Sequence, residues 1–210
     1  MSFDKIICVG KNYLEHAKEL GDEVPEKPVL FLKPASVLRQ VSGWGEQIQV
    51  GFPHEDTEVQ PECEIALRLA QDGYKMTIED ARNAIADITL GLEMTLRARQ
   101  AKLKKQGHPW TTSKVFKDAA IIGPWIPYEQ FNEYMSAEFQ LLLDGTLRQC
   151  AKGTDMMMYP EDLLVYISQF FPLKAGDIIY TGTPAGVTSI SESTTAELRW
   201  KNYFYTVKWQ

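Results

Sequence analysis

Cysteine is scarce in this sequence, and its spacing excludes two common kinds of scaffold. The three cysteines, Cys8, Cys63 and Cys150, are an odd number and show no C-x-x-C spacing. They therefore do not form the framework of a disulfide-rich domain or a cysteine-ligated zinc site. Reduced thiols in a cytosolic protein are the simpler interpretation.

Long hydrophobic runs and an excess of positive charge are also lacking. The apolar run at residues 6–9 is too short for the core of a signal peptide, and no stretch approaches the roughly 20 apolar residues that cross a bilayer. The sequence holds 22 basic against 28 acidic residues, whereas general nucleic-acid binders carry a basic surplus. We therefore expect a cytoplasmic protein that binds neither membranes nor nucleic acid.

What the sequence does contain is typical of one globular domain rich in strands. Hydrophobic residues make up 44% of its 210 residues, and no internal repeat or low-complexity linker divides residues 1–210. Strands and helices do not alternate regularly, which predicts an α+β, β-rich fold rather than a doubly wound parallel sheet. Periodicity predicts strands at 5–9, 29–32, 62–69, 88–95, 139–143, 146–150 and 176–181, helices at 13–20, 78–86 and 160–171, and a C-terminal hairpin rich in aromatic residues that belong either to the core or to an interface.

Three glutamates are candidate metal ligands. Glu62 and Glu64 are two residues apart in a predicted strand and therefore share a face. Glu93 interrupts an apolar strand, where a carboxylate needs a partner. A hard divalent cation such as Mg²⁺ or Mn²⁺ would relieve their repulsion. A solvated strand face for the pair, and a salt bridge from Glu93 to Arg97 or Arg99, are the alternatives.

His16 and Glu19 lie at positions i and i+3 of the predicted helix, so they share a face. A carboxylate beside an imidazole raises its basicity, as a general base for water requires. A solvent-facing helix pair is the alternative. His54 and His108 have no comparable partner, and we interpret both as surface or packing residues.

Several cationic residues and one turn are candidates for anion binding. Lys114 lies in a stretch predicted to be extended, and the turn 182–184 offers backbone N–H groups together with a hydroxyl. Residues 96–106 are strongly basic, which favours a solvated helix face or an attractor of anionic substrates over RNA binding. Packing and turn formation alone would also explain Lys114 and the turn.

Taken together, these segments resemble the fumarylacetoacetate hydrolase (FAH) family, most closely its short members of the acylpyruvase and oxaloacetate decarboxylase/tautomerase type. The resemblance spans about residues 5–187 and lies in the order and spacing of the motifs. They are ICVGKNY at 7–13 with His16 and Glu19, PVLFLKP at 28–34, Glu62-x-Glu64, EMTLR at 93–97 with Gln100, G-x-PW at 107–110 leading to Lys114, and AGDIIYTGTP-x-GV at 175–187.

The resemblance implies an FAH C-terminal-domain-like mixed β-sheet roll with short flanking helices, assembled as a homodimer around one Mg²⁺ or Mn²⁺ per chain. It implies that the metal ligands are Glu62, Glu64 and Glu93, that the catalytic residues are Lys114 and the lid-helix pair His16 and Glu19, and that Lys33, Arg97, Gln100 and Thr183 bind substrate. The sequence departs from the family at Glu93, which stands for an aspartate, and at Ala98, Lys117 and Gln60-Pro61, where an aspartate, an aspartate and a histidine are usual.

The resemblance further implies a metal-dependent enzyme that acts on small 2-oxo acids through an enolate. Acylpyruvate hydrolysis and oxaloacetate decarboxylation or tautomerisation are the expected reactions. One alternative is an isomerase or decarboxylase acting on 2-hydroxyhepta-2,4-diene-1,7-dioate. Another is a metal-free, non-catalytic binding protein with the same fold.

Overall fold

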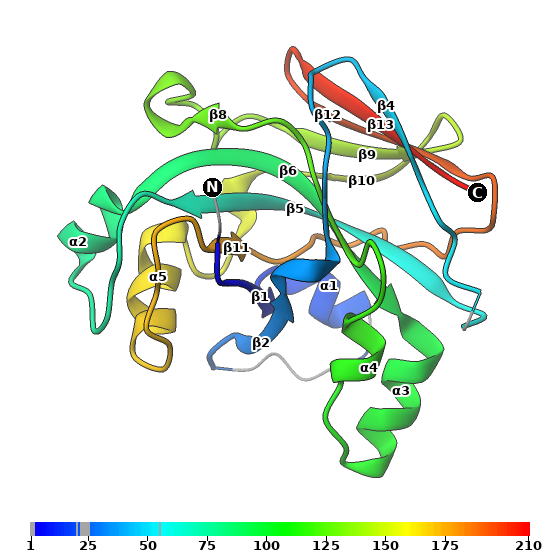
Figure 1. Cartoon of the computed structure of the whole chain (residues 1–210), viewed down its shortest axis with the longest axis horizontal. Coiled ribbons are helices and arrows are strands. Elements are labelled where there is room, and N and C mark those ends of the chain that lie inside the picture. Colours follow the sequence, from blue (N-terminus) through cyan, green and yellow to red (C-terminus); the bar gives the residue numbers. More distant parts are fainter. Residues whose placement is uncertain (1–2, 20, 22–25, 55) are drawn as a thin grey trace.

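The computed structural model describes residues 3–19, 21, 26–54 and 56–210. In this part of the chain, strands form an eight-stranded mixed sheet and a five-stranded sheet, with short helices at the periphery (Figure 1). The predicted β-rich α+β class is thereby confirmed.

The larger sheet contains, in spatial order, β2 (Val29–Pro34), β1 (Lys5–Gly10), β11 (Ile178–Tyr180), β5 (Val59–Leu69), β6 (Ile85–Leu96), β7 (Ala120–Ile122) and β3 (Leu38–Gln40), with β8 (Ile126–Pro127) paired to β6. The smaller sheet contains β10 (Thr146–Ala151), β9 (Phe139–Leu143), β12 (Thr195–Trp200), β13 (Tyr203–Trp209) and β4 (Gln47–Val50). The helices are α1 (Leu14–Glu19), α2 (Ile78–Asn83), α3 (Arg97–Gln106), α4 (Thr111–Lys114) and α5 (Pro160–Ser168), and short 3₁₀ turns cover Ala35–Val37, Tyr128–Gln130 and Gly153–Asp155.

The antiparallel pair β5–β6 is the backbone of the larger sheet. Its register pairs every residue from Val59 to Arg68 with a residue of β6, and a bulge follows at Leu69. Most side chains on both strands are buried on both faces of the sheet, which explains why these segments are nearly continuously apolar rather than alternating. A polar residue placed here is held inside the protein.

Two local predictions were wrong, the first through strand pairing and the second through a local helical turn. The helix expected at 78–86 ends at Asn83, because Ile85 already pairs with Leu69 and begins β6. The stretch around Lys114, expected to be extended, forms the short helix α4, in which Val115 N–H donates to Thr111 O at 2.8 Å.

Helix α1 occupies residues 14–19 of the predicted 13–20, and residue 20 lies outside the described residues. Asn12 lies just before the helix, and its side-chain amide forms hydrogen bonds with two other segments of the chain. It donates to Thr181 O (2.8 Å) and Met158 O (3.0 Å), and its oxygen accepts from Met158 N–H (2.9 Å). Asn12 thus ties the start of this helix to the segment after β11.

The C-terminal aromatic residues belong mainly to the core. Trp200, Tyr205 and Trp209 are buried, whereas Phe204 is 45% exposed. Cys8, Cys63 and Cys150 are free thiols, as expected. Among the described residues, no helix combines the length and apolar character needed to cross a bilayer.

Candidate active site

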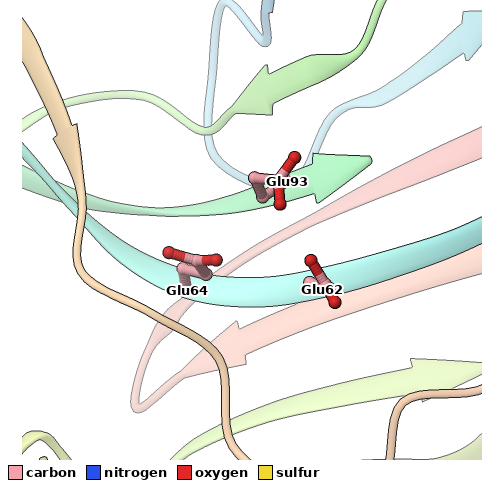
Figure 2. A group of neighbouring side chains, drawn as sticks. All are labelled: Glu62, Glu64 and Glu93. Carbon is pink, nitrogen blue, oxygen red and sulfur yellow. The ribbon is translucent and has the colours of Figure 1, made fainter. Parts of the chain in front are cut away.

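Strands β5 and β6 bring the three candidate carboxylates together. Glu62 and Glu93 are directly paired across the strands, and Glu64 is paired with Gly91, where a Cβ would lie 2.9 Å from the Tyr180 ring. One carboxylate oxygen from each glutamate lies within 4.8 Å of the others, and Figure 2 shows the three side chains gathered over the strand pair. All three are buried, so a solvated strand face is excluded.

Two buried lysines and one arginine surround this cluster. Lys114 Nζ donates to Glu62 Oε2 (3.0 Å) and to Thr95 Oγ1 (2.6 Å), and it also contacts Glu93. Arg97 forms an ion pair with Glu62 and not with Glu93, so the expected alternative salt bridge to Glu93 is replaced by lysine contacts.

Lys33 lies beneath the cluster and is also one of the residues lining a neighbouring cavity of about 750 Å³. Its side chain is fully buried, and its ammonium contacts Glu93 and donates to Ala119 O (2.6 Å) and Met94 O (2.9 Å). In this geometry Lys33 forms an ion pair with Glu93, and its expected role in substrate binding stays a prediction.

The environment of the cluster shifts the pKa values of Glu62 and Glu64 in opposite directions. Burial alone raises the pKa of Glu62, but the Lys114 and Arg97 charges outweigh it and hold that pKa well below its usual range. Burial, reinforced by Glu93 and Glu62, raises the pKa of Glu64 well above its usual range. Burial likewise raises the pKa of Glu93, so Glu64 and Glu93 are the two carboxylates whose charged form is disfavoured here.

The donor set fits a hard divalent cation. Its oxygens come from two strands of one sheet, so their spacing is fixed by the backbone. Glu93 Oε1 accepts no hydrogen bond from the described residues, although it lies against the Lys33 ammonium. Three carboxylates, without histidine or thiolate, are the ligands that Mg²⁺ and Mn²⁺ prefer over zinc.

His16 and Glu19 form the contact that their spacing predicted. His16 Nδ1 lies 3.1 Å from Glu19 Oε2, and His16 Nε2 lies 4.0 Å from Glu62 Oε1. The histidine is 5% exposed, so the pair does not face solvent. Glu19 also accepts hydrogen bonds from Gly186 N–H, at 3.1 and 3.2 Å, which fasten the end of α1 to the turn after β11.

The three glutamates, His16 and Lys114 line a small cavity with a volume of about 50 Å³. The predicted residues Arg97, Gln100 and Thr183 line it as well. Arg97 donates to Gln100 Oε1 at 2.7 Å, and both side chains face the cavity. Thr183 lines it as well, but its hydroxyl is engaged with Cys63 O (2.9 Å). Gly182 N–H donates to Glu64 Oε2 (2.6 Å), so this turn N–H serves a carboxylate of the protein rather than a bound anion.

Several residues of this cavity were not among the predicted site residues, although one of them, Lys104, lies in the basic segment 96–106 that we interpreted as a solvated face or an anion attractor. Lys104 lies seven residues after Arg97 and four after Gln100, so helical periodicity was a signal that it shares their face. Phe31 and Trp110 also line the cavity and face each other edge to face, with ring centres 6.3 Å apart. They also line a larger, mostly apolar cavity of about 750 Å³, which no sequence pattern had indicated.

Comparisons with known proteins agree with this geometry. Residues 5–203 match the family model described as fumarylacetoacetate (FAA) hydrolase C-terminal. Oxaloacetate tautomerase YcgM of Escherichia coli is 38% identical over 184 residues, which cover 87% of this chain and 82% of that protein. A mitochondrial oxaloacetate decarboxylase of Dictyostelium discoideum is 35% identical over 184 residues, with the same coverage of 87% and 82%.

Solved structures of similar fold include an enzyme with a bound metal. The crystal structure of fumarylpyruvate hydrolase from Pseudomonas aeruginosa, in complex with Mn²⁺ and pyruvate, superposes with a TM-score of 0.93 at 29% identity, covering 100% of this chain and 91% of that one. A fumarylacetoacetate hydrolase family structure from Yersinia pestis has a TM-score of 0.92 at 32% identity, covering 100% and 95%. The family match and these relatives span most of the chain, and the chain therefore belongs to the fumarylacetoacetate hydrolase family of enzymes.

Proposed function

We propose that this protein is a metal-dependent enzyme that interconverts the keto and enol forms of oxaloacetate and decarboxylates it. The observation that carries the proposal is one small cavity lined by three buried carboxylates and by His16, which Glu19 contacts from behind. The names of the tautomerase and decarboxylase relatives support oxaloacetate as the substrate.

Glu62, Glu64 and Glu93 would hold one Mg²⁺ or Mn²⁺. When bound, such a metal supplies a Lewis acid that polarises the 2-oxo group and stabilises the negative charge of an enolate. The Mn²⁺ and pyruvate in the similar fumarylpyruvate hydrolase structure support this assignment.

His16 would move the proton at the reacting carbon. Its Nδ1 side is held by Glu19, which leaves Nε2 directed at the carboxylate cluster as the base that takes a proton from C3 of the substrate and returns one to it. In decarboxylation the C3–C4 bond breaks instead, CO₂ leaves, and its electron pair remains on C3 of the enolate.

Lys114, Arg97 and Gln100 would stabilise and orient the anionic substrate. Lys114 keeps its positive charge, because Glu62 and Glu93 outweigh burial and raise its pKa above the usual value. Its charge thus lies beside the place where enolate charge develops. Arg97 and Gln100 are hydrogen-bonded to each other, so they present a fixed pair of polar groups to a carboxylate.

Acylpyruvate hydrolysis is the second candidate, and the His16–Glu19 pair favours it specifically. A hydrolase needs a base for water: the new bond joins the water oxygen to C4, and the C3–C4 bond then breaks with its electrons going to the enolate. The similarity to fumarylpyruvate hydrolase supports this candidate. A structure from Mycobacterium marinum, named as a 2-hydroxyhepta-2,4-diene-1,7-dioate isomerase, is similar at 26% identity with a TM-score of 0.81, and such a diene substrate remains the third candidate.

A metal-free binding protein is less consistent with the site, because His16, Lys114 and Arg97 all line one cavity and Glu19 contacts His16. Assembly as a homodimer and a cytoplasmic location complete the proposal.

The proposal is tested with ultraviolet assays of oxaloacetate enolisation and decarboxylation and of acetylpyruvate cleavage, each with Mg²⁺, with Mn²⁺ and with EDTA. Faster turnover of oxaloacetate that is lost in EDTA supports the tautomerase/decarboxylase assignment. Faster cleavage of acetylpyruvate supports the hydrolase instead. No turnover together with no metal binding in calorimetry contradicts an enzymatic role, and metal binding without turnover directs the search to longer diene acids.

A further inference from the structure

Gln149 is a buried polar side chain that leaves the smaller sheet and enters the wall of the active site. It lies on β10 and is fully buried. Its Oε1 accepts from Cys63 N–H (2.9 Å), and its Nε2 donates to Thr183 Oγ1 (2.8 Å) and to Pro184 O (2.7 Å). All of these partners belong to segments outside its own sheet.

The strand geometry explains why a side chain is needed at this place. Strand β11 pairs with β5 only as far as Tyr180 opposite Ala66, and Thr181 N–H then donates to Ile65 O. Between this point and the isolated bridge of Val59 with Ile190, no strand of the described residues pairs with this edge of β5. Gln149 supplies the acceptor for Cys63 N–H, and Thr183 Oγ1 supplies the donor for Cys63 O (2.9 Å). Side chains thus replace the missing ladder at the residue between Glu62 and Glu64.

The turn that Gln149 holds also touches the site at both ends. At one end, Gly182 N–H donates to Glu64. At the other end, Gly186 N–H donates to Glu19, the partner of His16. A Cβ on Gly186 would lie 1.9 Å from Arg148 O, so this end of the turn packs directly against the bulged backbone beside Gln149.

We propose that Gln149 is a positioning residue that fixes the turn 182–186. Through its two ends, this turn fixes the position of Glu64 relative to the Glu19–His16 pair. Gln149 does not line the cavity, so it acts through the turn rather than on the substrate. Its effect on turnover rests on the proposed function, whereas its effect on Glu64 does not.

The test compares Gln149→Met, which keeps most of the volume but loses the three hydrogen bonds, with Gln140→Met on the neighbouring strand β9 as the control. We expect Gln149→Met to lower kcat about 10- to 100-fold with a smaller change in KM, because misplacement of a catalytic pair affects the reaction more than binding. We also expect Mn²⁺ affinity, measured by calorimetry, to fall about 10-fold through Glu64. Melting curves establish that each variant is folded at the assay temperature.

A double-mutant cycle with Glu19→Ala separates positioning from general destabilisation. If Gln149 acts through the turn on Glu19, Gln149→Met lowers kcat by a smaller factor in the Glu19→Ala background than in the wild type. If the two residues act independently, Gln149→Met lowers kcat by the same factor in both backgrounds. Additive losses, or kcat and Mn²⁺ affinity equal to those of Gln140→Met, would overturn the proposal.

If Gln149→Met does not fold, a second pair of variants tests the same hydrogen bonds by changing Thr183 instead. Thr183→Val removes the hydroxyl between Gln149 and Cys63, and Thr183→Ser keeps it. We expect the valine variant to lose Mn²⁺ affinity and the serine variant to retain it, and equal affinities would contradict the inference. If the wild type turns over no substrate, the proposed function fails, but the Mn²⁺ measurement still tests Gln149.

Discussion

Glu62 and Glu93 face each other directly across the antiparallel strands β5 and β6, in the interior of the larger sheet. Like charges in such a pair destabilise a sheet unless other groups compensate them. Lys114 contacts both carboxylates, and Arg97 and Lys33 each contact one. The pairing thus concentrates negative charge at a place that only cations can stabilise, and this has measurable consequences.

Metal binding should depend on the carboxylate cluster and not on acidic residues in general. We expect Glu64→Gln to weaken Mn²⁺ binding by at least about 10-fold, because it removes a charged oxygen ligand from a buried site. Isothermal calorimetry of the EDTA-treated protein measures this. Glu197→Gln, which alters a half-buried glutamate paired with Arg199 in the smaller sheet, is the control. Equal affinities of the two variants would refute the metal assignment.

Lys114 should contribute more to the free energy of unfolding when the protein is free of metal than when metal is bound. Lys114→Met leaves two buried carboxylates without their shared cation, and breaking a buried ion pair in this way costs about 3–5 kcal/mol. For a chain of this length, that corresponds to a drop in Tm of about 6 °C or more. Added Mn²⁺ should restore more of the Tm in this variant than it adds to the wild type. Thermal melts with Lys174→Met, at an exposed ion pair, as control check this, and an unchanged Tm would contradict it.

Glu19 should matter more for hydrolysis than for decarboxylation, because only hydrolysis needs an activated water. We expect Glu19→Ala to lower acetylpyruvate cleavage by about 100-fold or more and oxaloacetate decarboxylation far less. Glu15→Ala changes an exposed glutamate of the same helix and should leave both rates unaltered. Steady-state kinetics on the two substrates decides, and equal losses would argue against a role in water activation.

Lys104 should favour substrates with a second carboxylate. It lines the cavity on the same face of α3 as Arg97 and Gln100. We expect Lys104→Met to lower kcat/KM for oxaloacetate by about 10-fold, the magnitude of one charge-assisted hydrogen bond, and to spare acetylpyruvate. Lys105→Met, at an exposed position of the same helix, is the control. Equal decreases of kcat/KM for both substrates would show that Lys104 does not bind the second carboxylate of oxaloacetate.

Local pattern identified the longer strands and helices and several of the candidate site residues, but it missed the short strands β3, β4, β7 and β8. The two-residue spacing of Glu62 and Glu64, the three-residue spacing of His16 and Glu19, and the Thr77 cap of α2 each depend on neighbours in the chain, so the sequence determined them. The ordered motifs resembled one family, and the comparisons confirmed it.

Only the tertiary structure decided how these pieces meet. The register that sets Glu93 opposite Glu62, the burial of Lys33 beneath Glu93, and the reach of Gln149 from one sheet to the other join residues that are far apart in the chain. No periodicity records such contacts, because they are fixed by strand pairing and by the need to satisfy buried charges and backbone groups once the sheets have packed.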